Sequence, residues 1–325
     1  MIARDTPYAN LTPEVVLAAI ERLGRPTDGR VLALGSYENR VYQVGLEDAQ
    51  PLVVKFYRPN RWSVEAILEE HAFAHELASA EIPVVAPERL DGATLFEYHG
   101  YRYAVYPRRG GRWPELATAD DRVLMGRFLG RLHRVGATRR FEHRASLSVD
   151  AMVRSSAAVI TAGDWLPEYL RARYSDSVRA IAEQAEAAFT AVARHLRVHG
   201  DCHRGNVLWT ETGPHFVDLD DCAMAPAIQD LWMLLAGSRS EMTAQCRDLL
   251  EGYEQFHEFD RGELALIEPL RAMRMVHYAA WLARRWSDPA FPRAFPWFGE
   301  ARYWENHVLE LGQQLEALAE PTLRL

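Results

Sequence analysis

The sequence predicts an α+β fold with two lobes: a small β-rich lobe over residues 1–107 and a larger helical lobe over residues 108–325. Two observations support this division. Short β-rich runs dominate the part before Pro107, whereas the hydrophobic residues after it recur with the period of amphipathic helices. The length of 325 residues and the 48% hydrophobic share are sufficient for two substantial cores.

The N-terminal lobe is predicted to begin with a helix in the segment LTPEVVLAAIERLG. Thr12 is a suitable N-cap, Pro13 stands at the first helical position, and Gly24 follows the end. These residue types at these positions are typical of an α-helix with defined ends.

Three short β-rich runs follow and predict an antiparallel meander: RVLALG, NRVYQVG and PLVVKFY. Turn-prone residues separate them. A second helix is predicted from about Ser63 to Ala80, and two further strands are predicted at TLFEY and YRYAVYP. The chain then leaves this lobe near Tyr106 to Arg109.

The C-terminal lobe is predicted to be mainly helical. Amphipathic or apolar helical patterns occur at VLMGRFLGRLHRV, SVRAIAEQAEAAFTAVARHL, QDLWMLL, AQCRDLLEGYEQFHEF and ELALIEPLRAMRMVHYAAWLARRW. The polar segment VHGDCHRGNVLW reads as a loop, and HFVDLD reads as a short strand. The aromatic segment WSDPAFPRAFPWFGEARYW reads as a packed connection.

Charge and cysteine content narrow the partners and the compartment. The 37 basic and 45 acidic residues give a net charge of −8, so we expect neither nucleic acid nor a membrane surface as a partner. No apolar run of about 18 residues occurs that would predict a membrane span. The cysteines Cys202, Cys222 and Cys246 show no paired spacing, which favours the cytoplasm.

Three oxygen-bearing side chains in the polar loop and the strand after it are candidates for phosphoryl-transfer chemistry. Asp201 and Asn206 lie in the loop, and Asp218 lies at the end of the strand. One carboxylate orients and deprotonates a hydroxyl, while an amide oxygen and a second carboxylate bind Mg²⁺. The structural alternative is that these residues only cap turns.

The histidines of the same loop give a rival hypothesis. His199, Asp201 and His203 alternate, and alternating His and Asp residues can bind zinc in a metallohydrolase. Gly200 and Gly205 argue for a looping path that would not place all three on one side. His199 is therefore expected to brace the backbone.

Lys55 lies inside the apolar run PLVVKFYRP and therefore needs an anionic partner. The following helix offers several glutamates. Glu70 shares a helical face with Phe73 and Leu77, which would turn it inward, so we prefer it to Glu69. The structural alternative is a lysine on an edge strand whose amine reaches water.

Further polar residues near these candidates have open roles. Ser36 lies at the bend of LGSYENRVYQV, where backbone N–H groups could bind phosphate. Asp230 either caps its own helix or accepts hydrogen bonds from a neighbouring loop. Asp220 and Asp221 either add negative charge near a metal or face water.

The segments VHGDCHRGNVLW and FVDLDD resemble the catalytic loop and metal-binding strand of the aminoglycoside phosphotransferase and choline kinase group, relatives of the protein kinases. Nearly the whole chain takes part in this resemblance. The segments SYENRVYQV, VVKFYRP, ILEEH, PAIQDLWMLL and EPLRAMR are similar to those of bacterial serine/threonine protein kinases of this fold that act in a stress response. No DFG or APE motif follows Asp218, so an ordinary activation segment is not expected.

The resemblance implies a protein-kinase-like fold and a role for each matching residue. Asp201 and Asp218 match catalytic residues, and Asn206 and Asp218 match the magnesium ligands. Lys55 matches the lysine that holds the ATP phosphates, and Glu70 matches its partner.

The resemblance extends to the nucleotide-binding loop and the connection between the lobes. Ser36 falls where this group closes its nucleotide loop. Tyr106 and Arg108 fall in the hinge whose backbone meets adenine.

The sequence thus predicts a cytoplasmic, monomeric, ATP- and Mg²⁺-dependent kinase that phosphorylates serine or threonine of a protein substrate. The first alternative is a small-molecule kinase of the same fold, acting on an amino alcohol, a sugar or an aminoglycoside. The second is a pseudokinase scaffold, which would be expected to lack Lys55, Asp201 or Asp218, and all three are present.

Overall fold

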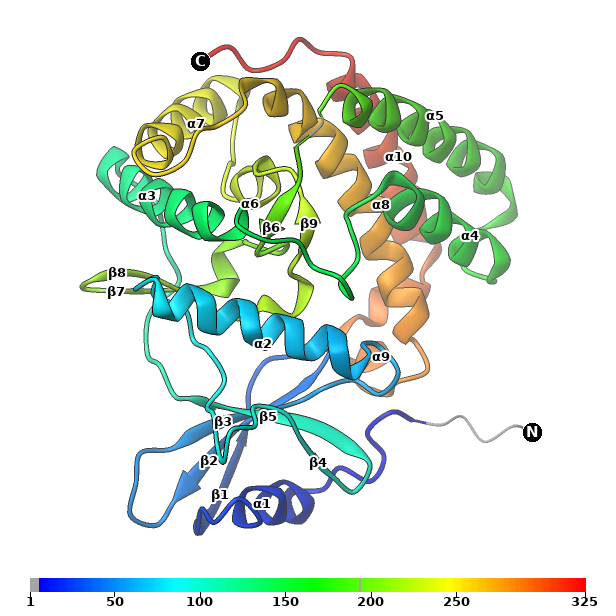
Figure 1. Cartoon of the computed structure of the whole chain (residues 1–325). Coiled ribbons are helices and arrows are strands. Elements are labelled where there is room, and N and C mark those ends of the chain that lie inside the picture. The colour runs from blue at the N-terminus through cyan, green and yellow to red at the C-terminus, as the bar shows by residue number, and fades with distance from the viewer. Residues whose placement is uncertain (1–5, 193) are drawn as a thin grey trace.

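The computed structural model describes residues 6–192 and 194–325. A five-stranded sheet with helix α1 forms one end of the molecule, and most of the other helices form the opposite end (Figure 1). Helix α2 lies between the two parts.

The sheet has the strand order β1-β2-β3-β5-β4 and is antiparallel throughout, so the predicted meander is confirmed. Its strands are β1 (Thr27–Ala33), β2 (Arg40–Leu46), β3 (Leu52–Phe56), β4 (Phe96–Tyr98) and β5 (Tyr101–Pro107). Lys55 is on the central strand and pairs in register with Val41 on one side and Ala104 on the other. Two neighbouring strands therefore fix the position of its backbone.

Helix α1 (Pro13–Glu21) covers one face of this sheet. The Thr12 side chain accepts the hydrogen bond of Val15 N, as its predicted N-cap role requires. The apolar residues of α1, including Val16 and Ile20, pack with Val44 and other residues of the sheet.

Helix α2 (Val64–Ser79) begins after the N-cap Ser63, in agreement with the predicted helix. Ile67 packs with Tyr57 near the sheet, whereas Phe73 and Leu77 join the core of the helical part. The helix therefore contacts both parts of the molecule.

The C-terminal part consists mainly of helices. They are α3 (Ala119–Gly136), α4 (Ser155–Ala162), α5 (Arg171–Thr190), α6 (Ile228–Trp232), α7 (Arg239–Tyr253), α8 (Ile267–Arg285), α9 (Ala290–Ala294) and α10 (Ala301–Leu318). Short helical turns accompany them: η1 (Asp150–Arg154), η2 (Glu168–Leu170), η3 (Arg204–Asn206), η4 (Leu219–Asp221), η5 (Arg261–Leu266) and η6 (Pro296–Gly299). One core joins α3, α6 and α7, and a second joins α4, α5, α8 and α10.

Helices α3 and α7 approach each other closely because glycines line their contact. A Cβ on Gly126 of α3 would overlap the carbonyl oxygen of Leu249, and one on Gly252 of α7 would overlap that of Val123. Only residues without a side chain allow this separation of the two backbones.

Two small antiparallel pairs carry the polar loop. Strand β6 (Leu196–Val198) pairs with β9 (Ala223–Ala225), and β7 (Val207–Thr210) pairs with β8 (Gly213–Phe216). The loop prediction is correct for the middle of VHGDCHRGNVLW, whose ends are strands.

The predicted helix ending in ARHL is too long. Helix α5 ends at Thr190, and Leu196 already belongs to β6. Its neighbours Arg197 and Val198 are buried and pair with β9, so tertiary pairing overrides the local helical pattern.

The aromatic segment predicted as a connection contains helix α9 and the beginning of α10. Phe291, Phe298 and Trp304 of this segment are completely buried. Among the described residues, every helix is too short or too polar to serve as a membrane span.

Candidate active site

Lys55 is at the centre of a buried ion cluster. Its Nζ lies 3.1 Å from Glu70 Oε1, 3.1 Å from Asp218 Oδ1 and 3.2 Å from Asp220 Oδ1. The lysine is only 5% exposed. Residues from β3, α2 and the segment after β8 therefore meet at one point.

The charges of this cluster determine its protonation. Burial alone would lower the pKa of Lys55, but the carboxylates of Asp220 and Glu70 raise that pKa well above its usual value. Burial raises the pKa of Glu70, against the opposing effect of the Lys55 charge. The lysine is therefore positively charged at neutral pH.

Glu69 and Glu70 have different partners. Glu70 faces Lys55, whereas the Glu69 carboxylate accepts hydrogen bonds from backbone N–H groups in the loop after α3, namely those of Glu142, His143 and Arg144 at 2.6, 2.8 and 3.0 Å. The geometry thus assigns the ion pair to Glu70 and a loop-fixing contact to Glu69.

Asp201 lies in the polar loop beside Asn206. Asn206 Nδ2 donates to the Asp201 carbonyl oxygen at 3.0 Å and to Oδ2 at 3.3 Å. Arg274 of α8 donates to Oδ1 at 2.6 Å, and His203 Nε2 lies 3.4 Å from Oδ2. Burial would raise the pKa of Asp201, but the hydrogen bond from His203 and the charge of Arg274 hold it below its usual value. The carboxylate is therefore ionised.

Asp230 holds the beginning of this loop. Its carboxylate accepts hydrogen bonds from His199 N at 2.7 Å and Gly200 N at 2.8 Å, and it contacts His133 Nε2 at 3.0 Å. Of the two roles considered for Asp230, the structure shows the one that fixes a neighbouring loop. Gly200 has a φ of +85°, and a Cβ there would overlap the carbonyl oxygen of Asp221.

The His199 side chain braces the loop from within. It is completely buried, and its Nε2 lies 2.9 Å from the carbonyl oxygen of Val217. This contact matches the predicted bracing role and removes His199 from a zinc site. Over residues 6–192 and 194–325, no three His, Cys, Asp or Glu side chains are grouped in a way that could hold a metal ion.

Asp218 and Asn206 offer the oxygen donors that Mg²⁺ prefers. The Asp218 side chain is 46% exposed, and only its Oδ1 contacts Lys55. Its φ of 59° and ψ of 66° are left-handed, a conformation that is rare for aspartate and that redirects the side chain after β8. Asn206 uses Nδ2 toward Asp201, which leaves its Oδ1 for a cation. The donor chemistry of the two side chains therefore suits the magnesium ion predicted for them.

Ser36 lies in the loop between β1 and β2, which we call the nucleotide loop (residues 34–39). Ser36 Oγ donates to the carbonyl oxygen of Asn39 at 3.3 Å. Asn39 in turn donates to Asp220 Oδ2 at 3.1 Å and accepts from Arg58 N at 3.1 Å. The nucleotide loop is therefore linked to the Lys55 cluster through Asn39 and Asp220.

The residues predicted to form the hinge lie at the end of β5, where Tyr106 belongs to the strand and Arg108 follows it. The Tyr106 hydroxyl lies 3.1 Å from that of Tyr57, and burial raises the pKa of Tyr106. Arg108 donates to Gln43 Oε1 at 2.8 Å on the exposed side of the sheet. The Arg108 side chain is thus not among the groups that converge on Lys55, so a contact to nucleotide at this position would use its backbone.

The sequence interpretation missed part of this site. Asp220 does not face water: it is 3% exposed and forms ion pairs with Lys55 and Arg61. Arg61 also contacts Asp221 at 2.6 Å. The sequence signal that could have revealed this partner is Arg61, the second arginine in FYRPNRW, directly after the strand that carries Lys55.

A set of contacts that we call the clasp joins the nucleotide loop to α8 and to the segment after it. At one contact, Glu38 accepts hydrogen bonds from Trp281 Nε1 at 2.5 Å and from Arg285 Nε at 3.0 Å. At the other, Asp288 accepts from Arg40 at 2.8 Å and from Arg58 at 2.9 Å. The clasp thus links the sheet directly to the helical part.

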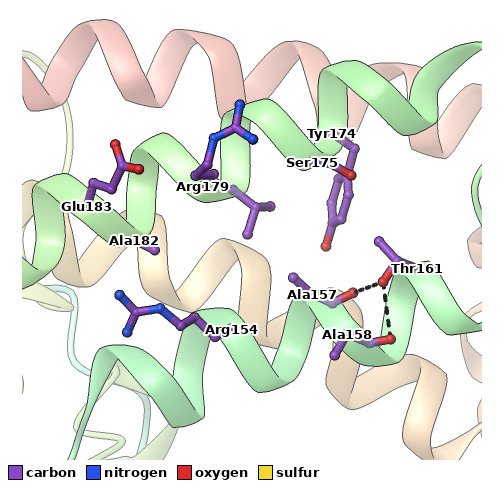
Figure 2. Close-up of a pocket in the computed structure, with 10 residues that line it drawn as sticks. Arg154, Ala157, Ala158, Thr161, Tyr174, Ser175, Arg179, Ala182 and Glu183 are labelled. Carbon is purple, nitrogen blue, oxygen red and sulfur yellow. Dashed lines mark hydrogen bonds between the residues drawn. The ribbon is translucent and has the colours of Figure 1, made fainter.

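A separate surface pocket lies between α4 and α5 (Figure 2). Arg154 of η1, Thr161 of α4, and Tyr174 and Arg179 of α5 are among its lining residues. None of the predicted site residues lines it, so it is distinct from the Lys55 cluster.

Comparisons with known proteins show the family to which the chain belongs. The model of the phosphotransferase enzyme family (APH) matches residues 30–267. Stress response kinase A of Escherichia coli K12 is 44% identical over 322 residues, which cover 98% of this chain and 97% of the relative. The serine/threonine protein kinase RdoA of Salmonella typhimurium LT2 is 44% identical over 318 residues, with the same coverage of both chains.

Solved structures share the fold at low identity. An amicoumacin kinase in complex with AMP-PNP and Ca²⁺ has a TM-score of 0.72 and 19% identity, covering 89% of this chain and 90% of that one. A microcompartment-associated aminopropanol kinase has a TM-score of 0.68 and 17% identity, covering 95% of this chain and 99% of that one.

The fold and the family match define a two-lobed kinase with the aminoglycoside phosphotransferase and choline kinase-like architecture. The chain belongs to the phosphotransferase enzyme family, and it is closely similar to the bacterial stress response kinases A.

Proposed function

We propose that this protein is an ATP- and Mg²⁺-dependent serine/threonine protein kinase of a bacterial stress response. The observation that carries the proposal is the meeting of Lys55, Glu70 and Asp218 at one point, although they come from distant parts of the chain. The names of its relatives at 44% identity support a protein acceptor.

Each residue has one task in the proposed reaction. Lys55, held by Glu70, binds the ATP phosphates, and Asn206 and Asp218 hold Mg²⁺, which neutralises phosphate charge. The nucleotide loop with Ser36 covers the phosphates. The backbone near Tyr106 and Arg108 meets the adenine.

Asp201 acts on the acceptor. Its ionised carboxylate accepts the proton of the serine or threonine hydroxyl while the hydroxyl oxygen bonds to the γ-phosphorus. The bond between the γ-phosphorus and the bridging oxygen breaks, and ADP leaves with that oxygen. Asp230 and His199 contribute by keeping this loop in place.

The proposal includes a cytoplasmic location, a monomeric state and a lobe boundary between residues 107 and 108. The three cysteines, Cys202, Cys222 and Cys246, are free and buried, as expected of a protein from a reducing compartment. Size-exclusion chromatography with light scattering measures the oligomeric state directly.

The test uses labelled ATP and Mg²⁺ with the wild-type protein, a set of generic protein acceptors and a pool of small metabolites. We expect label on protein serine or threonine. Label confined to an amino alcohol, a sugar or an aminoglycoside would contradict the protein-kinase proposal and identify a small-molecule kinase of the same fold.

The matched variant is Asp201→Asn, which keeps the size of the side chain. It should bind Mg·ATP with nearly wild-type affinity, while the rate of transfer falls by about 10²- to 10⁴-fold because the proton acceptor is lost. Unchanged turnover would exclude Asp201 as the base. Calorimetry for binding and single-turnover transfer for the rate separate the two effects.

A further inference from the structure

Arg274 is the basic group nearest to the proposed catalytic base. It projects from α8, and its Nη1 donates to Asp201 Oδ1 at 2.6 Å. Within the described part of the chain this is its one hydrogen bond to another side chain, and 41% of the Arg274 side chain is exposed. Its other N–H groups therefore have no side-chain acceptor among the described residues, and the partly exposed side chain lies next to Asp201 Oδ1.

One face of α8 extends from the catalytic loop to the nucleotide loop. Arg274, Tyr278, Trp281 and Arg285 follow at intervals of three or four residues and so share this face. Arg274 contacts Asp201, whereas Trp281 and Arg285 contact Glu38. An acceptor whose hydroxyl reaches Asp201 must therefore lie beside this face and close to the guanidinium of Arg274.

The carboxylates around this space already have basic partners. Asp221 pairs with Arg61 at 2.6 Å, and Glu38 pairs with Arg285 at 2.8 Å. Asp220 is buried in the Lys55 cluster. A site for an ammonium group requires an anion that is not already neutralised. The carboxylates of Asp221, Glu38 and Asp220 therefore have no unpaired negative charge to offer an ammonium group, and Asp218 is assigned to the metal.

We propose that Arg274 makes the site select acceptors that carry no positive charge beside the accepting hydroxyl. A neutral or acidic serine/threonine segment is then phosphorylated in preference to a basic segment or an amino alcohol. This inference rests on the proposed function and specifies its substrate class. As Asp201 takes the hydroxyl proton, its negative charge is lost and no longer offsets the charge of Arg274. Two like charges about 5 Å apart at a protein surface then repel strongly enough to lower kcat/KM by about ten-fold or more.

The test compares three peptides that differ only in the residues flanking one serine: glutamate, alanine or lysine. The wild-type protein should prefer the glutamate-flanked peptide to the lysine-flanked one by about ten-fold or more in kcat/KM. In Arg274→Gln this preference should shrink by about ten-fold, mainly because the lysine-flanked peptide improves. Equal preference in the wild type and in Arg274→Gln would overturn the inference.

Two further variants separate charge recognition from a structural role. Arg274→Lys keeps the positive charge and should keep the preference for the glutamate-flanked peptide. Arg271→Gln changes an arginine one turn earlier on α8 that pairs with Glu268 at 3.1 Å instead of Asp201, so it should also keep the preference. Loss of the preference in Arg271→Gln to the same degree would overturn the assignment to Arg274.

A second pair of acceptors distinguishes failure of this inference from failure of the proposed function. If no peptide is labelled, aminopropanol and propanediol are compared as small acceptors of the same size. A rise in the use of aminopropanol relative to propanediol in Arg274→Gln supports the inference and contradicts only the protein-kinase proposal. No change in that ratio, or no transfer by the wild type to any acceptor, overturns the inference.

Discussion

Lys55 has three carboxylates within 3.2 Å, so its charge is already neutralised before a nucleotide binds. A phosphate group that binds Lys55 has to compete with Asp218 and Asp220. Asp220 is held by Asn39 and Arg61, and Glu70 is buried, whereas Asp218 is half-exposed. Asp218 is therefore the carboxylate best able to leave the lysine and take up a metal ion.

The neighbours Glu69 and Glu70 give a matched test at this scale. Glu70→Gln removes a buried charge from Lys55 and should weaken Mg·ATP binding by about ten-fold or more. Glu69→Gln affects only the loop at residues 142–144 and should leave ATP affinity within about two-fold of the wild type. Calorimetric titration with Mg·ATP checks both. An equal loss in the two variants would exclude Glu70 as the special partner of the lysine.

Sequence reasoning found the residues of this site that stand in recognisable motifs. Lys55 could be named because it lies inside an apolar β-rich run, and Asp201 and Asn206 could be named because they belong to a polar loop between apolar flanks. Arg274 could not be identified as a site residue from the sequence, because an arginine in an amphipathic helix normally lies at a solvated surface. Its partner Asp201 is 73 residues away in sequence, and only tertiary structure brings the two together.

At the level of elements, helix α6 matters because it carries Asp230. Glu263 holds the beginning of this helix: its Oε2 accepts the hydrogen bond of Ile228 N at 2.8 Å, and the residue is 1% exposed. Burial raises the pKa of Glu263 to about 7. The anchor of α6 therefore titrates near neutral pH.

This pKa predicts how the stability depends on pH. Between about pH 4.5 and 7 the folded state keeps a proton on Glu263 that the unfolded state has lost, so the free energy of unfolding falls as pH rises. The resulting decrease in the free energy of unfolding approaches roughly 3 kcal/mol above pH 7, and it vanishes below about pH 4.5.

The glutamine side chain of Glu263→Gln cannot titrate, so this variant should lack the pH-dependent decrease in the free energy of unfolding. Urea unfolding of both proteins at pH 5 and pH 8 measures it: the wild type should lose stability relative to the variant on going to pH 8. Parallel changes in the two proteins would contradict the raised pKa.

Helices and strands could be predicted where the hydrophobic period and the capping residues agreed. They were harder to predict where tertiary contacts determine the secondary structure. The N-cap Thr12 and a helix start at about Ser63 were predicted, and both helices begin directly after these residues. Strand β6 was hidden, because Leu196 continues an amphipathic helical pattern and only pairing with β9 makes it a strand. The proline-bearing aromatic segment hid α9, since prolines usually mark loops.

For the whole molecule, the clasp connects the nucleotide loop to the end of α8. Asp288 is 3% exposed and accepts hydrogen bonds from Arg40 of β2 and from Arg58, which follows β3. Tyr37 of the nucleotide loop also packs on Phe291 and Phe295, with ring centroids 6.3 and 5.0 Å apart. Relative motion of the two parts therefore has to break both buried ion pairs and aromatic contacts.

Asp288→Asn tests this connection. Removing the charge takes the buried carboxylate away from Arg40 and Arg58, of which Arg58 keeps Glu38 at 3.0 Å, so the free energy of unfolding should fall by about 3 kcal/mol. Hydrogen exchange in the nucleotide loop should accelerate, and the apparent KM for ATP should rise. Denaturant unfolding, exchange mass spectrometry and initial rates measure these three effects.

The control is Asp176→Asn, which removes an exposed ion pair with Arg179 on α5. It should change the free energy of unfolding by less than about 1 kcal/mol and leave the nucleotide loop unaffected. Equal exchange rates in the loop for Asp288→Asn and the wild type would show that the clasp does not restrain it.

The position of the clasp in the chain also affects when the protein becomes active during synthesis on a ribosome. The sheet emerges first, but its nucleotide loop finds Trp281 and Phe295, and Arg40 finds Asp288, only after nearly three hundred residues have been translated. A nascent chain, or a product truncated before residue 281, would have Lys55 and yet lack the contacts that tie the nucleotide loop to α8. Competence to use ATP is thus expected to arise late, once translation is almost finished.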